Sequence, residues 1–161
     1  MTFNFVTLNL DNQLQATMIG FFEHQYITYK KNHIKNLLAL AKADGNMHPK
    51  EEALLYKIAK RYGLKDKQVK QLIDADEKFE VNVPDNHNDK MNLLYDLILM
   101  VYADDVVDKH EIEFCKQAVK NFGMKEELVP WLLEEFEKGT PPPPDEWEEI
   151  KREAKEKFIK K

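Results

Sequence analysis

Apolar side chains recur every three or four residues along most of this chain, in runs separated by short polar stretches. This spacing places the apolar positions on one face of an α-helix. Only residues 1–10 alternate weakly, which leaves open an extended arm or the lead into a helix. The pattern predicts an all-α fold. The runs with helical spacing are residues 11–29, 34–43, 53–62, 66–77, 93–103, 112–122 and 127–138.

The chain contains an internal repeat, because residues 34–78 match residues 94–138 without a gap at a shift of sixty positions. A repeat determines the architecture that a chain can adopt. We therefore predict a compact helical bundle of two pseudo-repeated three-helix units, preceded by an N-terminal helix. The connecting residues 78–88 are interpreted as a hinge within one domain, which spans residues 1–140. The identical pairs at the turns are Asp44 with Asp104, Glu51 with Glu111 and Gly63 with Gly123.

The C-terminal part of the chain has a different pattern. Four prolines at 141–144 predict a stiff, extended spacer. Residues 145–161 then predict an amphipathic helix, with Trp147, Ile150 and Phe158 on one stripe. This helix either covers an apolar groove on the repeat body, or docks a protein partner or a second copy of the chain. Self-association through the C-terminal helix therefore stays open.

The corner that precedes the second helix of each unit begins Ala-Asp and has a Glu seven positions after the Asp. Asp44-Gly45 with Glu51, and Asp104 with Glu111, resemble the hallmark of the TerB-like family. That family is named for a tellurite-resistance protein and includes the front segment of a membrane-anchored DnaJ-like co-chaperone. The resemblance covers residues 24–140, although Asp105 replaces the glycine in the second corner. It implies an all-helical fold, an acidic surface, a proposed divalent-cation site, a link to stress responses and no settled activity.

The acids of the two corners could hold a cation. Asp44 and Asp104 each end a predicted helix, where the helix dipole disfavours a carboxylate unless a positive group offsets it. Calcium takes roughly six to eight oxygen ligands, often from clustered carboxylates, although this spacing is not that of an EF-hand. We therefore expect a divalent-cation site, with calcium as the first candidate and the second corner favoured. Its candidate ligands are Asp44, Glu51, Asp104, Asp105, Asp108 and Glu111.

The same two glutamates have a purely structural interpretation. If His48 and Asp108 are N-caps, Glu51 and Glu111 fall at the third helical position, where a capping box places a Glu. The second corner fits this box well and the first fits it less well, because histidine is a poor cap. On this interpretation the substitution Glu111→Gln lowers the melting temperature slightly, and no metal affects stability.

Composition limits the function further. The chain of 161 residues suits one domain, and its net charge of −5 makes a nucleic-acid partner unexpected. Its longest nearly unbroken apolar run, residues 97–103, is far shorter than the roughly 20 residues of a membrane helix, so we expect no membrane insertion. The single cysteine, Cys115, excludes an internal disulfide framework and is expected to be a small buried residue. With no signal peptide evident, a cytoplasmic location is expected.

No catalytic constellation is visible in the sequence. The five glycines are scattered rather than gathered into a phosphate-binding loop, and no nucleophile with a base accompanies Cys115. We therefore expect a non-enzymatic TerB-like adaptor that binds an unidentified protein partner and is tuned by a divalent cation. The alternative is a purely structural interaction module whose acids only cap helices.

Overall fold

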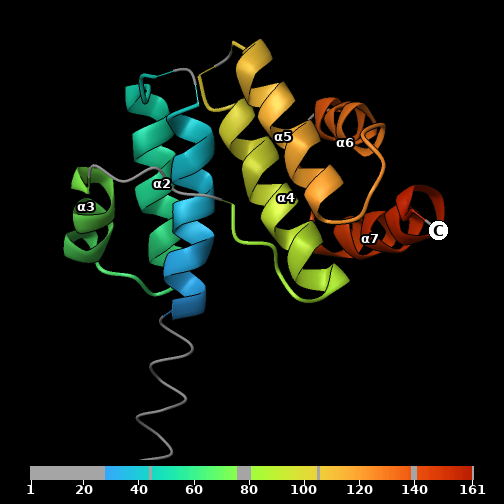
Figure 1. The fold of residues 1–161 in the computed structure, drawn as a ribbon, viewed down its shortest axis with the longest axis horizontal. Helices are drawn as coiled ribbons and strands as arrows, with labels where there is room; N and C mark the ends of the chain where they lie inside the picture. Colours follow the sequence, from blue (N-terminus) through green and yellow to red (C-terminus); the bar gives the residue numbers. More distant parts are fainter. Residues whose placement is uncertain (1–27, 44, 76–80, 105, 139–140, 161) are drawn as a thin grey trace, which may run out of the picture.

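The computed structural model describes residues 28–43, 45–75, 81–104, 106–138 and 141–160. Apart from one isolated β-bridge, the regular elements of this part of the chain are helices, so the predicted all-α fold is confirmed (Figure 1). The predicted N-terminal arm and most of the helix at 11–29 lie outside the described residues. The helices are residues 28–41, α2 (Pro49–Arg61), α3 (Asp66–Asp74), α4 (His87–Val101), α5 (Lys109–Asn121), α6 (Leu128–Glu137) and α7 (Pro144–Phe158).

The helix ends keep the sixty-residue spacing seen in the sequence. Helices α2 and α5 begin at positions 49 and 109 and end at 61 and 121, and the helices before them end at 41 and 101. Gly63 and Gly123 follow α2 and α5 with φ angles of 82° and 79°. This left-handed conformation is the usual stop of a helix and is most readily adopted by glycine.

Helix α4 forms the centre of the molecule. It contacts α2, α5, α6 and α7, and its buried side chains include Met91, Leu94 and Ile98. A helix that is apolar nearly all round belongs at the centre of a fold. The helix begins at His87 rather than near position 93, because the Asn86 side chain accepts the N–H of Asp89 at 2.8 Å and caps the first turn.

Helix α6 begins where a proline permits it. The sequence predicted a helix over residues 127–138, and α6 starts at Leu128. Pro130 is thus the third residue of the first turn, where the missing backbone N–H has no partner within the helix in any case. Helix α3 ends at Asp74, before the predicted limit of residue 77.

The proline segment, which the sequence predicts to be a stiff and extended spacer, is packed against the body. Pro142 is buried, and its carbonyl accepts a hydrogen bond from the Tyr95 hydroxyl at 2.9 Å. Pro144 is already the first residue of α7, where proline is well tolerated. The Nε1–H of Trp147 then donates to the Asn92 side chain at 3.0 Å. The prolines therefore direct α7 onto α4.

The C-terminal helix packs on its own chain. Trp147, Ile150 and Ala154 are buried on one face of α7, which contacts α4. After the helix, Ile159 forms an isolated antiparallel bridge with Met124, and the N–H of Lys125 donates to the Phe158 carbonyl at 2.8 Å. Of the two roles open for this helix, the structure shows the one in which it covers a groove on the repeat body.

The substitution Gly123→Ala is expected to lower the free energy of unfolding by about 1 kcal/mol. An added Cβ would meet no atom within 4 Å, so the cost comes only from the positive φ of 79°. Urea unfolding followed by circular dichroism measures the change. Gly123→Asn is the control and should cost less, because asparagine tolerates this conformation better. Equal costs for the two variants would contradict this explanation.

Candidate functional site

The two acidic corners lie at the same end of the molecule, where the turns before α2 and α5 come together (Figure 1). Glu51 and Glu111 are the third residues of these two helices. Each residue is only 3% exposed, and their side chains form a hydrogen bond with each other. The structure therefore brings the equivalent glutamates of the two units into one buried pair.

This environment holds a proton on the pair. Burial, followed by the hydrogen bond and the charge of Glu51, raises the pKa of Glu111 to about 9, with smaller contributions from Asp104 and Asp108. A hydrogen bond between two carboxyl groups requires one proton, which Glu111 retains at neutral pH. The Glu111 Oε2 atom is buried and has no hydrogen-bond partner among the described residues. The pair is therefore a buried acceptor site that is incompletely satisfied.

The capping pattern of the two corners is the reverse of the predicted one. His48 Nδ1 accepts the N–H of Lys50 at 3.2 Å, and Glu51 Oε2 accepts the N–H of His48 at 3.3 Å. The first corner thus has a complete capping box, because the imidazole nitrogen accepts as a carboxylate would. At the second corner Asp108 accepts the N–H of His110 at 2.6 Å, but no return bond from Glu111 is present among the described contacts.

The remaining candidate ligands are only partly described. Asp104 Oδ1 accepts the N–H of Val106 at 3.2 Å, so a backbone amide offsets the unfavourable end of the helix dipole. The backbone N–H of His110, with help from the His110 side chain, lowers the pKa of Asp108. Asp44 and Asp105 lie outside the described residues. Within the described part of the chain, no group of three or more His, Cys, Asp or Glu side chains could hold a metal ion.

Cys115 lies one turn after Glu111 on α5 and is fully buried, as the sequence predicted. Burial, followed by the charge of Glu111, raises the pKa of its thiol to about 12. A protonated, inaccessible thiol is neither a nucleophile nor a metal ligand. The cysteine therefore serves packing.

A second buried acid was missed in the sequence. Asp96 on α4 is 1% exposed and accepts hydrogen bonds from His33 Nε2 and Arg61 Nη2, both at 2.7 Å. The Tyr62 hydroxyl lies 3.5 Å from the same carboxylate, and burial and the charge of Asp96 raise its pKa. The available signal was a lone acid in the middle of the most apolar helix, which is buried only when it is paired.

The comparison with known families identifies the domain. The family model for tellurite resistance protein TerB matches residues 37–130, more than half of the chain. The chain belongs to the TerB family. Neither the curated proteins nor the solved structures gave a match. The TerB match includes both acidic corners and the Glu51–Glu111 pair, and ends within α6. TerB is a helical domain and not a known enzyme family.

No described helix combines the length and the apolar character that a membrane crossing requires. The longest of the named helices, α4 and α7, have 15 residues each.

Proposed function

We propose that this TerB-family protein is a non-enzymatic adaptor that binds a divalent cation, with calcium as the first candidate, at the Glu51–Glu111 pair. The observation that carries the proposal is the buried Glu111 Oε2 atom without a partner, beside a second buried carboxyl group. Buried polar atoms rarely stay unsatisfied, and hard cations prefer carboxylate oxygens. Asp104 and Asp108 would add negative potential, and Asp44 and Asp105 remain candidate ligands from the sequence.

The proton on the pair competes with any cation. Carboxylates bind metal ions in their deprotonated form, so binding would displace the proton from Glu111. The affinity for the ion should therefore rise with pH up to about 9, the pKa of Glu111. The positive ends of the α2 and α5 dipoles oppose a cation, which favours a weak site with a dissociation constant of about 1 mM. An ion bound here would join the two units at their shared end, and we propose that this adjusts the surface that a protein partner recognises in a stress response.

The alternative function is a structural interaction module without metal, in which the acids only cap helices. The complete capping box of His48 and Glu51 favours this alternative for the first corner. It does not account for Glu111, whose carboxyl group makes no bond to the Asp108 backbone among the described contacts and remains partly unsatisfied.

Calcium is expected to stabilise the protein by about 1 kcal/mol at 10 mM and pH 8, and by less at pH 6. Thermal unfolding with and without calcium measures this effect, and NMR titration should locate amide shifts in residues 104–111. Glu51→Gln and Asp104→Asn should abolish the response. Glu113→Gln is the control, because Glu113 lies on the same helix but is exposed, and it should leave the response unchanged. If 10 mM calcium produces no response, the proposed cation site is wrong and the structural module without metal remains.

A further inference from the structure

Charge is distributed unevenly between the two halves of the chain. Residues 28–75, which contain the first unit, carry 11 basic and five acidic side chains. Residues 81–160 carry 11 basic and 19 acidic side chains, so the net charge of −5 conceals a positive half and a negative half. An asymmetry of this size within one chain is typical of a protein that binds a charged surface.

The positive charge is concentrated in residues 57–70, the basic segment. It comprises the end of α2, the turn that follows and the first half of α3. The segment contains six basic side chains, all of them exposed, and one acid, Asp66. Arg61 pairs with Asp96, but the five lysines form no ion pair among the described contacts. These lysines are Lys57, Lys60, Lys65, Lys67 and Lys70.

The negative charge is concentrated in residues 134–149, the acidic segment. It includes the end of α6 and the start of α7, and contains seven acids and one lysine. The ring centroids of Phe136 on α6 and Trp147 on α7 lie 6.3 Å apart, so the acids that flank these rings are neighbours in space. The exposed acids of this segment that form no ion pair among the described contacts include Glu134, Asp145 and Glu146.

Both segments line one small cavity of about 270 Å³. Arg61 and Tyr62 of the basic segment and Trp147 and Glu148 of the acidic segment form part of its wall, together with Tyr95 of α4. The cavity contains no residue of the Glu51–Glu111 pair, so it is independent of the proposed cation site. Side chains of opposite charge therefore meet at a single aromatic cavity.

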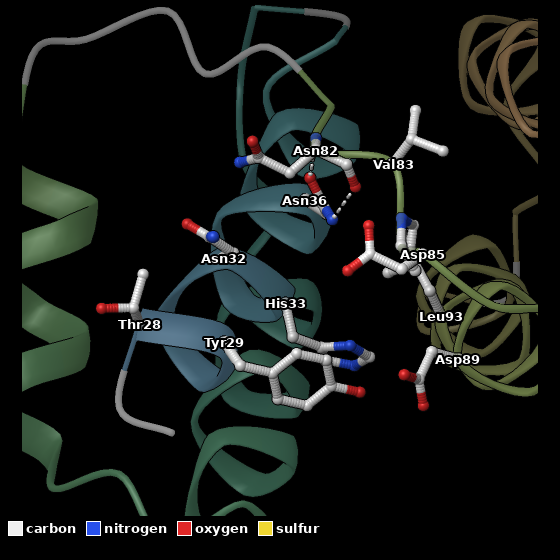
Figure 2. Close-up of a pocket in the computed structure, with 11 residues that line it drawn as sticks. Thr28, Tyr29, Asn32, His33, Asn36, Asn82, Val83, Asp85, Asp89 and Leu93 are labelled. Carbon is white, nitrogen blue, oxygen red and sulfur yellow. Dashed lines mark hydrogen bonds between the residues drawn. The ribbon is translucent and has the colours of Figure 1, made fainter. Parts of the chain in front are cut away.

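The larger cavity of the molecule does not combine the two charges. It has a volume of about 630 Å³ and lies between the helix at 28–41 and the segment that leads into α4 (Figure 2). Asp85 and Asp89 line it, but no lysine or arginine is among its described lining residues. The surface that is complementary to itself is therefore the one around the smaller cavity.

A surface with adjacent positive and negative segments can bind its own copy. A two-fold rotation places the basic segment of one copy against the acidic segment of the other, and forms the same contact twice. The aromatic side chains would lie at the centre of this contact and the charges at its rim, as in other protein interfaces. We propose that two copies of the chain form a two-fold dimer through the basic segment, the acidic segment and the cavity between them.

A second copy fits this surface better than another polyanion does. The acidic segment lies at the same cavity as the basic one, and it would repel a nucleic acid or an anionic membrane that approached the lysines. A second copy is complementary to both segments at once. Trp147 is only 7% exposed, so little apolar area is gained at the centre. The contact is therefore mainly electrostatic, weak and sensitive to salt.

Sedimentation velocity of the full 161-residue chain tests this proposal. The expected dissociation constant of the dimer is about 100 μM at about 0.1 M salt. It should be at least tenfold weaker at about 1 M salt, where the Debye length falls from roughly 10 Å to 3 Å. The double substitution Lys57→Glu with Lys60→Glu should weaken dimerisation about tenfold at the lower salt concentration. Asp145→Lys with Glu146→Lys should have the same effect.

Mixing the two double variants is the decisive step. One variant has two acidic segments and the other has two basic segments, so together they should form a heterodimer at least as tight as the original dimer. Lys50→Glu with Lys109→Glu is the matched control, because it makes the same change of charge at exposed positions in the first turns of α2 and α5. This control should dimerise as the original chain does. Circular dichroism confirms that each variant is folded.

Four outcomes would overturn the proposal. The first is a monomer at every concentration up to about 1 mM at the lower salt concentration. The second is an equal loss of dimerisation in the control variant. The third is a mixture of the two double variants that associates no more tightly than either variant alone. The fourth is a chain that stays monomeric but binds single-stranded RNA or vesicles with phosphatidylserine, which would assign the basic segment to a polyanion.

Discussion

Replacing Asp96 with asparagine is expected to lower the free energy of unfolding by about 3 kcal/mol, measured by urea unfolding at pH 7. The carboxylate is 1% exposed and accepts from His33 and Arg61, both at 2.7 Å. Asparagine keeps the shape of the side chain but replaces one acceptor oxygen with an NH₂ group. This NH₂ group would face an N–H donor of either His33 or Arg61. The cost falls mainly on His33, which is buried, because the Arg61 side chain is 57% exposed and can turn to water.

A second pair of variants separates the polar network from simple packing. Asp96→Leu should be strongly destabilising, and adding His33→Leu should recover much of the loss, because a buried pair can often be replaced by apolar side chains. Asp85→Asn is the control for loss of charge near α4, since Asp85 is exposed, and should change stability by less than about 0.5 kcal/mol. Stability of Asp96→Asn within 1 kcal/mol of the original would contradict a structural role for this network.

Glu111→Gln is expected to raise the free energy of unfolding by about 2 kcal/mol at pH 8 and to change it little at pH 5. The pKa of Glu111 is about 9 in the folded protein, above its usual value of 4.5. Between these values the folded protein holds a proton that the unfolded chain has lost. The stabilisation is therefore complete below pH 4.5 and is lost as pH rises through 9, by at most about 1.4 kcal/mol per pH unit.

We expect less than the full loss, because the turns beside the pair are exposed and water can approach the carboxyl group. Glutamine imitates the protonated acid and removes this dependence. Urea unfolding at pH 5, 6, 7 and 8 measures it, with the exposed Glu113→Gln as the control that keeps the original pH profile. If Glu111→Gln instead lowers stability slightly at every pH, the glutamate acts as a cap, as the structural interpretation of the sequence predicts.

Much of the fold could be predicted because it depends on local pattern. The three- to four-residue spacing of apolar positions predicted the helices, and the sixty-residue shift anticipated the matching ends of α2 and α5. Pro130 restricts where α6 can begin, because a proline is tolerated in the first turn of a helix but not in its interior. The start of α4 was missed because Asn86 is one of several asparagines before the helix, and only the structure shows which one caps it.

The candidate site was less accessible from the sequence. The repeat identified Glu51 and Glu111 as equivalent, but their contact depends on how the two units pack, which a linear pattern does not contain. The same reason explains the missed Asp96 network. The partners His33 and Arg61 lie 63 and 35 positions away in the chain, and a periodicity count treats Asp96 only as an interruption.

The packing of α7 on α4 has a consequence for synthesis on the ribosome. The nascent chain releases α4 and α5 well before α7, so the side of α4 that Trp147 and Ala154 later cover is still bare. The first unit can mature early, whereas the second stays exposed to chaperones and aggregation until α7 arrives. During translation the second half of the chain is therefore more prone to aggregation than the first half until α7 has been synthesised.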